Sequence, residues 1–91
     1  MKLHLTDTFS KGYKKLPNDI QKQVDKKLAL FIEQGQVYPS LRCKAFQKYK
    51  DEWIYELSVT KNYRIILQKI NSEEYYLLKV GPHDVLENFN L

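Results

Sequence analysis

The sequence predicts a small α+β domain, because the spacing of its apolar residues changes once along the chain. Up to Gly35 the apolar residues recur every three or four positions, as they do on one face of a helix. From Trp53 onward they alternate in twos, as they do in strands with one buried face. A chain of 91 residues has surface enough to bury for one core only. We therefore expect residues 1–91 to fold as a single domain.

The N-terminal part predicts a strand followed by two helices. Residues 2–6 alternate apolar and polar side chains and end at capping candidates that begin with Thr6. A short helix with one apolar stripe then ends at Pro17, which disfavours helical geometry in the residue before it. The second helix ends at Gly35. The apolar stripes expected to be buried are Phe9, Tyr13 and Leu16 on the first helix and Ile20, Val24, Leu28, Phe31 and Ile32 on the second.

These two helices are expected to form a hairpin, because only one or two residues join them. Their lysines should point mostly to solvent, although contact with phosphate is the alternative. The lysines concerned are Lys11, Lys14, Lys15, Lys22, Lys26 and Lys27.

The C-terminal part predicts a three-stranded meander. Residues 53–59 and 63–68 alternate on either side of a Lys61-Asn62 turn, and a third strand covers 75–80. Trp53 is expected in the core, because it is in phase with the next apolar positions of its strand. On the third strand, one face is expected to hold Tyr76, Leu78 and Val80, and the other Tyr75, Leu77 and Lys79.

The alternation divides the strands into an apolar face, which should pack on the helices, and a mixed face. The sequence offers no segment to cover the mixed face, so we expect it to be open to solvent. His83 follows the last strand directly, after a Gly81-Pro82 turn that places the imidazole near the strand end. The polar side chains expected on the mixed face are Glu56, Ser58, Arg64, Gln68 and Lys79.

These residue types fit the cleavage of RNA through the neighbouring 2′-hydroxyl. That reaction needs a base for the 2′-OH proton, a cation for the phosphorane charge and an acid for the leaving 5′ oxygen. Glu56 is the candidate base, Arg64 the phosphate clamp and His83 the acid. A simple cross-strand ion pair and a surface histidine in a turn are the plainer alternatives. No metal or other cofactor is expected, since the two histidines and Cys43 lack ligand spacing.

The charge balance favours an acidic or polyanionic partner. Lys and Arg total 15 against 11 Asp and Glu, a net charge of +4, which is also compatible with a simple solubility role. Residues 42–50 contain four cations and no acid. The candidate RNA-binding residues are Arg42, Lys44, Lys48, Lys50, Lys79 and Phe89.

A cytoplasmic protein is expected, without a membrane partner. The single Cys43 cannot form an intramolecular disulfide, and the first residues lack the apolar core of a signal peptide. No apolar run approaches the roughly 20 residues that cross a bilayer.

Five motifs in order resemble the RelE/ParE toxin superfamily over nearly the whole chain, although each alone is loose. They are Tyr13-Lys14-Lys15-Leu16-Pro17, Pro39-Ser40-Leu41-Arg42, Trp53-Ile54-Tyr55-Glu56-Leu57-Ser58-Val59, Asn62-Tyr63-Arg64-Ile65-Ile66 and Val80-Gly81-Pro82-His83-Asp84. The resemblance implies a β-α-α-β-β-β fold, with the helical hairpin packed on one face of a small, mainly antiparallel, curved sheet. It also implies a bacterial source and a cognate antitoxin bound in a hetero-oligomer. In the RelE branch it implies an mRNA interferase, a metal-independent endoribonuclease that cuts mRNA in the ribosomal A site and inhibits translation.

By position, the phosphate-binding arginine of the superfamily corresponds to Arg64, and its catalytic residue after the last strand to His83. Glu56 has no such counterpart and rests on the strand geometry alone. Many active members carry an aromatic residue shortly after the last strand, whereas here the ring in the tail is Phe89. Phe89 can stack a base for about 1–3 kcal/mol but has no phenolic proton. The alternative is that Phe89 and Leu91 fasten the tail to the core.

Two other functions stay open on the same fold. One is a ParE-like inhibitor that blocks DNA gyrase without cutting RNA. The other is a catalytically weakened module that still binds an antitoxin.

Overall fold

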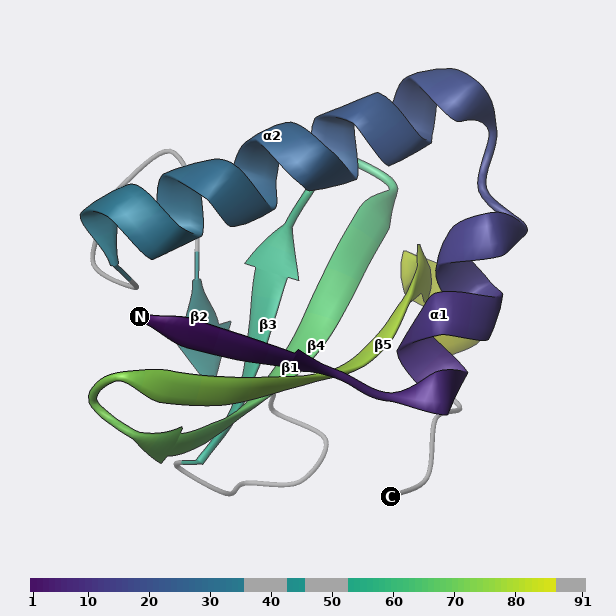
Figure 1. The fold of residues 1–91 in the computed structure, drawn as a ribbon. Coiled ribbons are helices and arrows are strands. Elements are labelled where there is room, and N and C mark those ends of the chain that lie inside the picture. The colour runs from purple at the N-terminus through teal and green to yellow at the C-terminus, as the bar shows by residue number, and fades with distance from the viewer. Residues whose placement is uncertain (36–42, 46–52, 87–91) are drawn as a thin grey trace.

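The computed structural model describes residues 1–35, 43–45 and 53–86. Figure 1 shows the helices α1 and α2 lying over one face of a twisted sheet. The α+β class and the predicted strand–helix–helix–strands order are confirmed, and the elements β2 and α3 are additional. In chain order the elements are β1 (Lys2–Leu5), α1 (Asp7–Lys14), α2 (Asn18–Gln34), β2 (Lys44–Ala45), β3 (Ile54–Ser58), β4 (Tyr63–Asn71), β5 (Glu74–Pro82) and α3 (His83–Leu86).

The strands form a sheet in the order β1-β5-β4-β3-β2. The three pairs from β2 to β5 are antiparallel, and β1 runs parallel to β5 at the edge. The strands β1 and β2 lie at opposite edges of the sheet, so the chain between them must cross one of its faces. The pair α1 and α2 makes this crossing, and the sheet therefore has one face covered by helices.

Local sequence signals set the helix ends. The Thr6 side chain caps α1 by accepting the Phe9 N–H at 3.2 Å, and its hydroxyl donates to the Leu77 carbonyl of β5 at 2.8 Å. Helix α2 begins after Pro17 and ends at Gly35, whose φ of 81° is a left-handed conformation that favours glycine. The end at Gly35 was predicted from the sequence.

The main core lies between the helical pair and the sheet. The predicted stripes of both helices contribute to it, but the expectation for Ile32 is wrong, since Ile32 is 48% exposed. Consecutive helical residues point about 100° apart, so Ile32 turns away when its neighbour Phe31 points inward. The buried residues of this core are Phe9, Leu16, Ile20, Val24, Phe31, Leu57, Val59, Ile65, Leu67, Tyr75, Leu77 and Val80.

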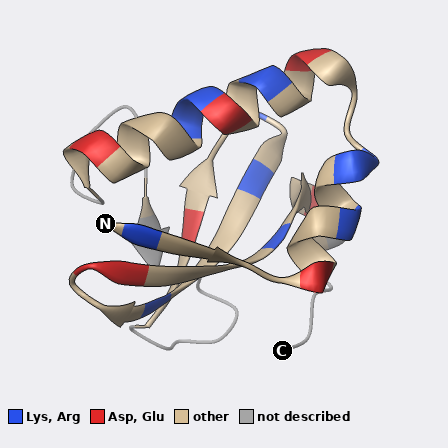
Figure 2. Cartoon of the chain, in the orientation of Figure 1, with Lys and Arg blue, Asp and Glu red and all other residues tan. Residues whose placement is uncertain are grey.

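The lysines of the helical pair face solvent, as predicted. Lys27 is half-buried, and the other five are exposed. Figure 2 shows both signs of charge on the outer surface of α2. A solvated, mixed-charge face explains these residues without a ligand.

The two faces predicted for the last strand are wrong from Leu78 onward. The register passes from Ile66–Lys79 directly to Leu67–Leu77, so a β-bulge at Leu78 changes the alternation. As a result Tyr75, Leu77 and Val80 all point into the main core. Strict alternation would instead put Tyr75 and Leu77 on one face and Val80 on the other.

The mixed face is not open to solvent throughout, contrary to the sequence prediction. Helix α3 folds back over it, and Leu86 packs with Ile54 and Ile66 in a second, smaller core. Glu56 also lies on this face and is only 7% exposed. A helix of four residues is too short to show a helical period, which explains why the sequence did not predict it.

The placement of Trp53 in the core was also wrong, because its side chain is 46% exposed. Trp53 precedes the first residue of β3 and lies in a turn, where strand alternation does not fix the direction of a side chain.

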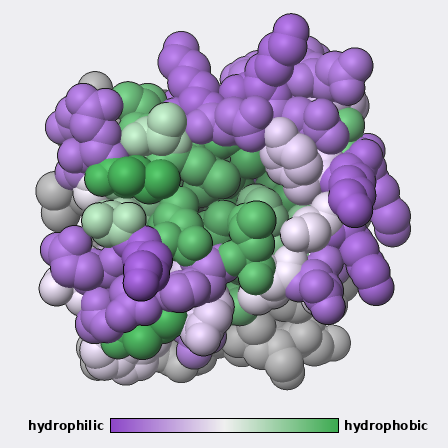
Figure 3. Space-filling view, in the orientation of Figure 1, coloured by the Kyte–Doolittle hydropathy of each residue, from purple (hydrophilic) through white to green (hydrophobic). Residues whose placement is uncertain are grey.

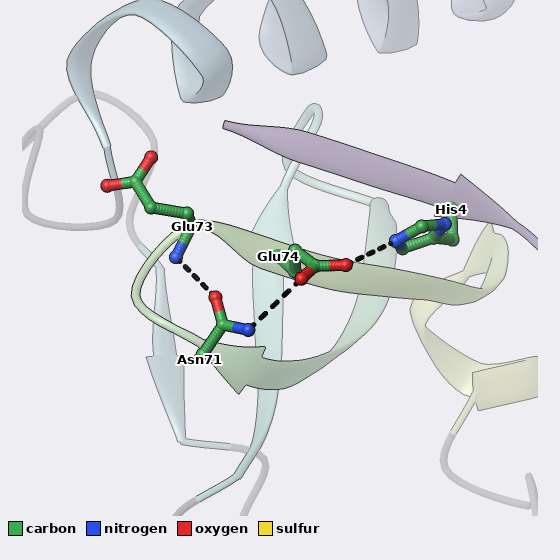
Figure 4. A network of polar contacts seen from close by, with 4 residues as sticks. All are labelled: His4, Asn71, Glu73 and Glu74. Atoms are coloured by element: carbon green, nitrogen blue, oxygen red, sulfur yellow. Dashed lines mark hydrogen bonds and ion pairs between the residues drawn. The ribbon is translucent and has the colours of Figure 1, made fainter.

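Polar contacts fasten the parallel edge of the sheet (Figure 4). The His4 imidazole of β1 donates to the Glu74 carboxylate of β5 at 2.9 Å, and the Asn71 amide donates to the same carboxylate at 3.2 Å. Both hydrogen bonds hold the pKa of Glu74 below its ordinary value, and the bond from His4 has the larger effect. The contact is half exposed, so it contributes to edge specificity more than to stability.

The described residues include no helix with the length and apolar character that crossing a bilayer requires.

Helix α1 approaches β5 most closely at Gly12, and this contact gives a stability test. A Cβ added there would lie 2.7 Å from the Val80 carbonyl oxygen, a backbone atom that cannot move alone. We expect Gly12→Ala to destabilise the fold by about 1–3 kcal/mol, despite alanine's better helix propensity, and to lower Tm by roughly 5–20 °C.

Gly81→Ala is the matched control, because an added Cβ there meets no atom of the described residues within 4 Å. Thermal melts by circular dichroism measure both variants. An unchanged Tm for Gly12→Ala would contradict the close packing of α1 on β5.

Candidate active site

A cleft of about 210 Å³ lies at one end of the sheet, where the β3–β4 turn meets the junction of β5 and α3. It contains both residues that the sequence singled out for phosphate chemistry, Arg64 and His83. The residues lining it are Lys61, Asn62, Arg64, Pro82, His83 and Asp84.

Arg64 reaches the cleft from β4, a strand with neighbours on both sides. In the register it pairs with Ser58 on β3 and with Gly81 on β5. Directly opposite residues share a face, so a side chain at position 81 would stand beside Arg64. Glycine leaves that space empty, since a Cβ there has no neighbour within 4 Å.

The Arg64 guanidinium also braces the β3–β4 turn. Its Nη1 donates to the carbonyls of Thr60 at 2.6 Å, Lys61 at 3.0 Å and Tyr63 at 3.0 Å. Among the described residues, the Nε and Nη2 atoms have no such acceptor. One edge of the guanidinium is thus fixed by the backbone, and the other has donors left for an oxyanion.

His83 is held by the same turn. Its backbone N–H donates to the Asn62 carbonyl at 2.7 Å, which joins the start of α3 to the residue two positions before Arg64. The imidazole is 43% exposed, and its Nδ1 lies 3.9 Å from the Asp84 carboxylate. The ring can therefore reach a ligand in the cleft, with an acid beside it.

Lys61 and Asn62 belong to this site and were missed as functional residues. The sequence assigned them to a turn, which is correct, but a turn gives no signal for what its side chains face. Lys61 is exposed and adds a second cation to the cleft wall. The cleft is thus lined by two positively charged side chains, Lys61 and Arg64, and by the negatively charged Asp84.

Glu56 and Lys79 do not line the cleft. Both lie on the same face of the sheet as Arg64, because each is paired with Ile66 of β4. Glu56 is buried and Lys79 is half-buried. The structure thus brings Arg64 and His83 into one cleft. Glu56 lies outside it, opposite Ile66, which is two residues after Arg64 on β4.

Of the other predicted RNA-binding residues, Lys44 lies in β2 and pairs with Glu56 in the register. Arg42, Lys48, Lys50 and Phe89 lie outside the described residues.

Cys43 is unsuited to act as a nucleophile. Burial, and then the charge of Glu56, raise the pKa of its thiol to about 11. At neutral pH almost none of it is thiolate, the form that attacks substrates and binds metals. Among the described residues no group of three or more His, Cys, Asp or Glu side chains could hold a metal ion.

Several solved structures have a similar fold and match almost the entire chain. A chain of the RelB–RelE antitoxin–toxin complex from Methanococcus jannaschii has a TM-score of 0.75 and 17% identity, covering 97% of this chain and 99% of that one. A chain of the E. coli DinJ–YafQ toxin–antitoxin complex has a TM-score of 0.76 and 14% identity, covering 92% and 93%. A chain of the intact E. coli RelBE complex has a TM-score of 0.66 and 20% identity, covering 88% and 93%.

A scan against protein-family models and a search of curated proteins found no match. The likeness to the solved structures therefore concerns the fold. The protein has the same fold as these structures, so the fold that the resemblance implied is confirmed.

Proposed function

We propose that the protein is the toxin of a toxin–antitoxin pair and cleaves mRNA on the ribosome. The observation that carries the proposal is the cleft that Arg64 and His83 line together, on a fold found in the toxins of known toxin–antitoxin complexes. Phosphate recognition by a guanidinium and proton transfer by an imidazole are the two functions that such a cleft can combine.

The proposed reaction is attack by a ribose 2′-hydroxyl on the adjacent phosphorus. The 2′-O–P bond forms as the bond from phosphorus to the 5′ oxygen breaks, which leaves a cyclic phosphate and a 5′-hydroxyl. Arg64, through Nε and Nη2, holds the phosphate and stabilises its developing charge, with Lys61 adding positive field. Protonated His83 donates its proton to the leaving 5′ oxygen.

The base that accepts the 2′-OH proton is one of two carboxylates. The sequence predicts Glu56, which is buried outside the cleft, whereas Asp84 lines the cleft and is fully exposed. Comparing Glu56→Gln with Asp84→Asn in the assay below identifies which one serves. The predicted contribution of Phe89, and of Arg42, Lys44, Lys48, Lys50 and Lys79, to RNA binding is part of the same proposal.

Expression of the chain without an antitoxin is expected to arrest growth and to leave cuts in translated mRNA. Arg64→Ala and His83→Ala should each lower cleavage by about 100-fold or more, because each removes a group that acts in the transition state. His4→Ala is the matched control, since His4 is the other histidine and lies in β1 at the sheet edge.

Toxicity that persists unchanged in both cleft variants would show that the site is wrongly assigned. Growth arrest with intact mRNA and accumulating gyrase–DNA breaks would establish the ParE-like function instead. Harmless expression with retained partner binding would indicate the weakened module.

The proposed antitoxin has a suitable docking surface on the helical side. An apolar groove of about 250 Å³ lies between β1, α1 and α2, and its lining includes Leu5, Phe9, Tyr13 and Leu28. Figure 3 shows hydrophobic side chains gathered there inside a hydrophilic frame. The charged residues that line the groove are Lys14 and Asp25, so an amphipathic segment with flanks of both charge signs fits it.

Leu5 is the most exposed large apolar residue described, at 66%, and lines this groove. We expect Leu5→Glu to weaken co-purification with the antitoxin by at least about tenfold, because a charged side chain would replace an apolar contact and lose its hydration beneath the docked segment. Ile70→Glu, an exposed apolar position on β4 that does not line the groove, is the control. Equal binding by the two variants would exclude the groove as the docking surface.

A further inference from the structure

Helix α3 begins with a cleft residue and ends with a core residue. His83 is its first residue and lines the cleft. Leu86, its last, is only 1% exposed and packs against Ile54, Ile66 and Leu78 on the outer face of the sheet. One turn of helix separates the two side chains, so they cannot move independently.

Contacts at both ends fix this short helix to the rest of the molecule. At its start the His83 N–H donates to the Asn62 carbonyl at 2.7 Å. At its end the Leu86 side chain fills the apolar space between β3, β4 and β5. An isolated helix of four residues is unstable in water, so tertiary contacts must hold it.

Among the described residues, the second core has three fully buried members, Ile54, Ile66 and Leu86, and Leu78 packs against them. It is separate from the main core beneath α1 and α2. Ile54 and Ile66 are themselves held in the sheet by their strand partners. Loss of the Leu86 side chain would therefore release α3 and leave the sheet and main core in place.

We propose that Leu86 is a positioning residue, which sets the imidazole of His83 at the phosphate cleft by anchoring α3. This inference rests on the proposed function for its catalytic consequence. Leu86 does not line the cleft and has no chemistry of its own, so its effect passes through the geometry of His83. Small displacements of a catalytic group lower rates steeply, since the reacting atoms must be about 3 Å apart.

The test compares Leu86→Ala with Leu16→Ala, which removes a similarly buried leucine from the main core. Imidazole resonances are followed by NMR through a pH titration, with His4 as an internal reference, alongside ribosome-dependent RNA cleavage. Leu86→Ala should shift and broaden the His83 resonances and lower kcat by roughly 10- to 100-fold, with KM nearly unchanged because Arg64 still binds the phosphate. Leu16→Ala should lower Tm and leave the His83 resonances in place.

Leu86→Met is the rescue variant, because it restores an apolar side chain of similar volume, and it should recover both the resonances and the rate. It also keeps the test decisive if Leu86→Ala fails to fold. Unchanged His83 resonances in a folded Leu86→Ala, equal shifts in Leu16→Ala, or no recovery in Leu86→Met would overturn the proposal. If the wild-type protein cleaves no RNA, the proposed function fails, whereas the NMR comparison still decides whether Leu86 positions His83.

Discussion

The site depends on one turn, because the Arg64 side chain and the His83 backbone are both hydrogen-bonded to carbonyls between β3 and β4. Arg64 donates to the Thr60 and Lys61 carbonyls, and the His83 N–H donates to the Asn62 carbonyl. These hydrogen bonds connect a residue of β4 and a residue of α3 to the same short segment. Thr60 is half-buried, and a carbonyl withdrawn from water needs a donor, so the turn and Arg64 stabilise one another.

The two faces of the sheet differ in what they contain. The face beneath α1 and α2 contains the large core, which supplies most of the apolar burial. The outer face contains the cleft, the short helix α3 and a core of three buried residues. Separating the two allows the cleft to keep exposed cations while the fold remains stable. The proposed antitoxin groove lies on the helical side, so the surfaces proposed for the partner and for the phosphate are different.

The elements with a regular period were predictable from the sequence. The stripe that includes Val24 and Phe31 predicted α2, Gly35 predicted its end, and alternation predicted β3 and β4. The failures have local causes. The bulge at Leu78 inserts one residue that alternation cannot anticipate, and α3 is shorter than any helical period.

The candidate site was predictable in part for similar reasons. Arg64 and His83 could be paired because strand order brings the start of β4 beside the end of β5. The burial of Glu56 could not be foreseen, because it depends on what covers the outer face of the sheet. Lys61 was missed because its position in the cleft depends on the junction of β5 and α3, which only the tertiary structure defines. Local pattern thus gives the strands, and contacts between distant segments decide which of their side chains meet.

The central claim is that Arg64 and His83 hold one phosphate together, and an NMR titration tests it most directly. The ligand is a short RNA with a 2′-deoxy sugar at the attacking position, which binds but cannot be cleaved. The account predicts that the side-chain resonances of Arg64 and His83 shift with the same midpoint, and that Arg64→Ala removes the His83 shift. Shifts in only one of the two residues, or a His83 shift that survives Arg64→Ala, would contradict it.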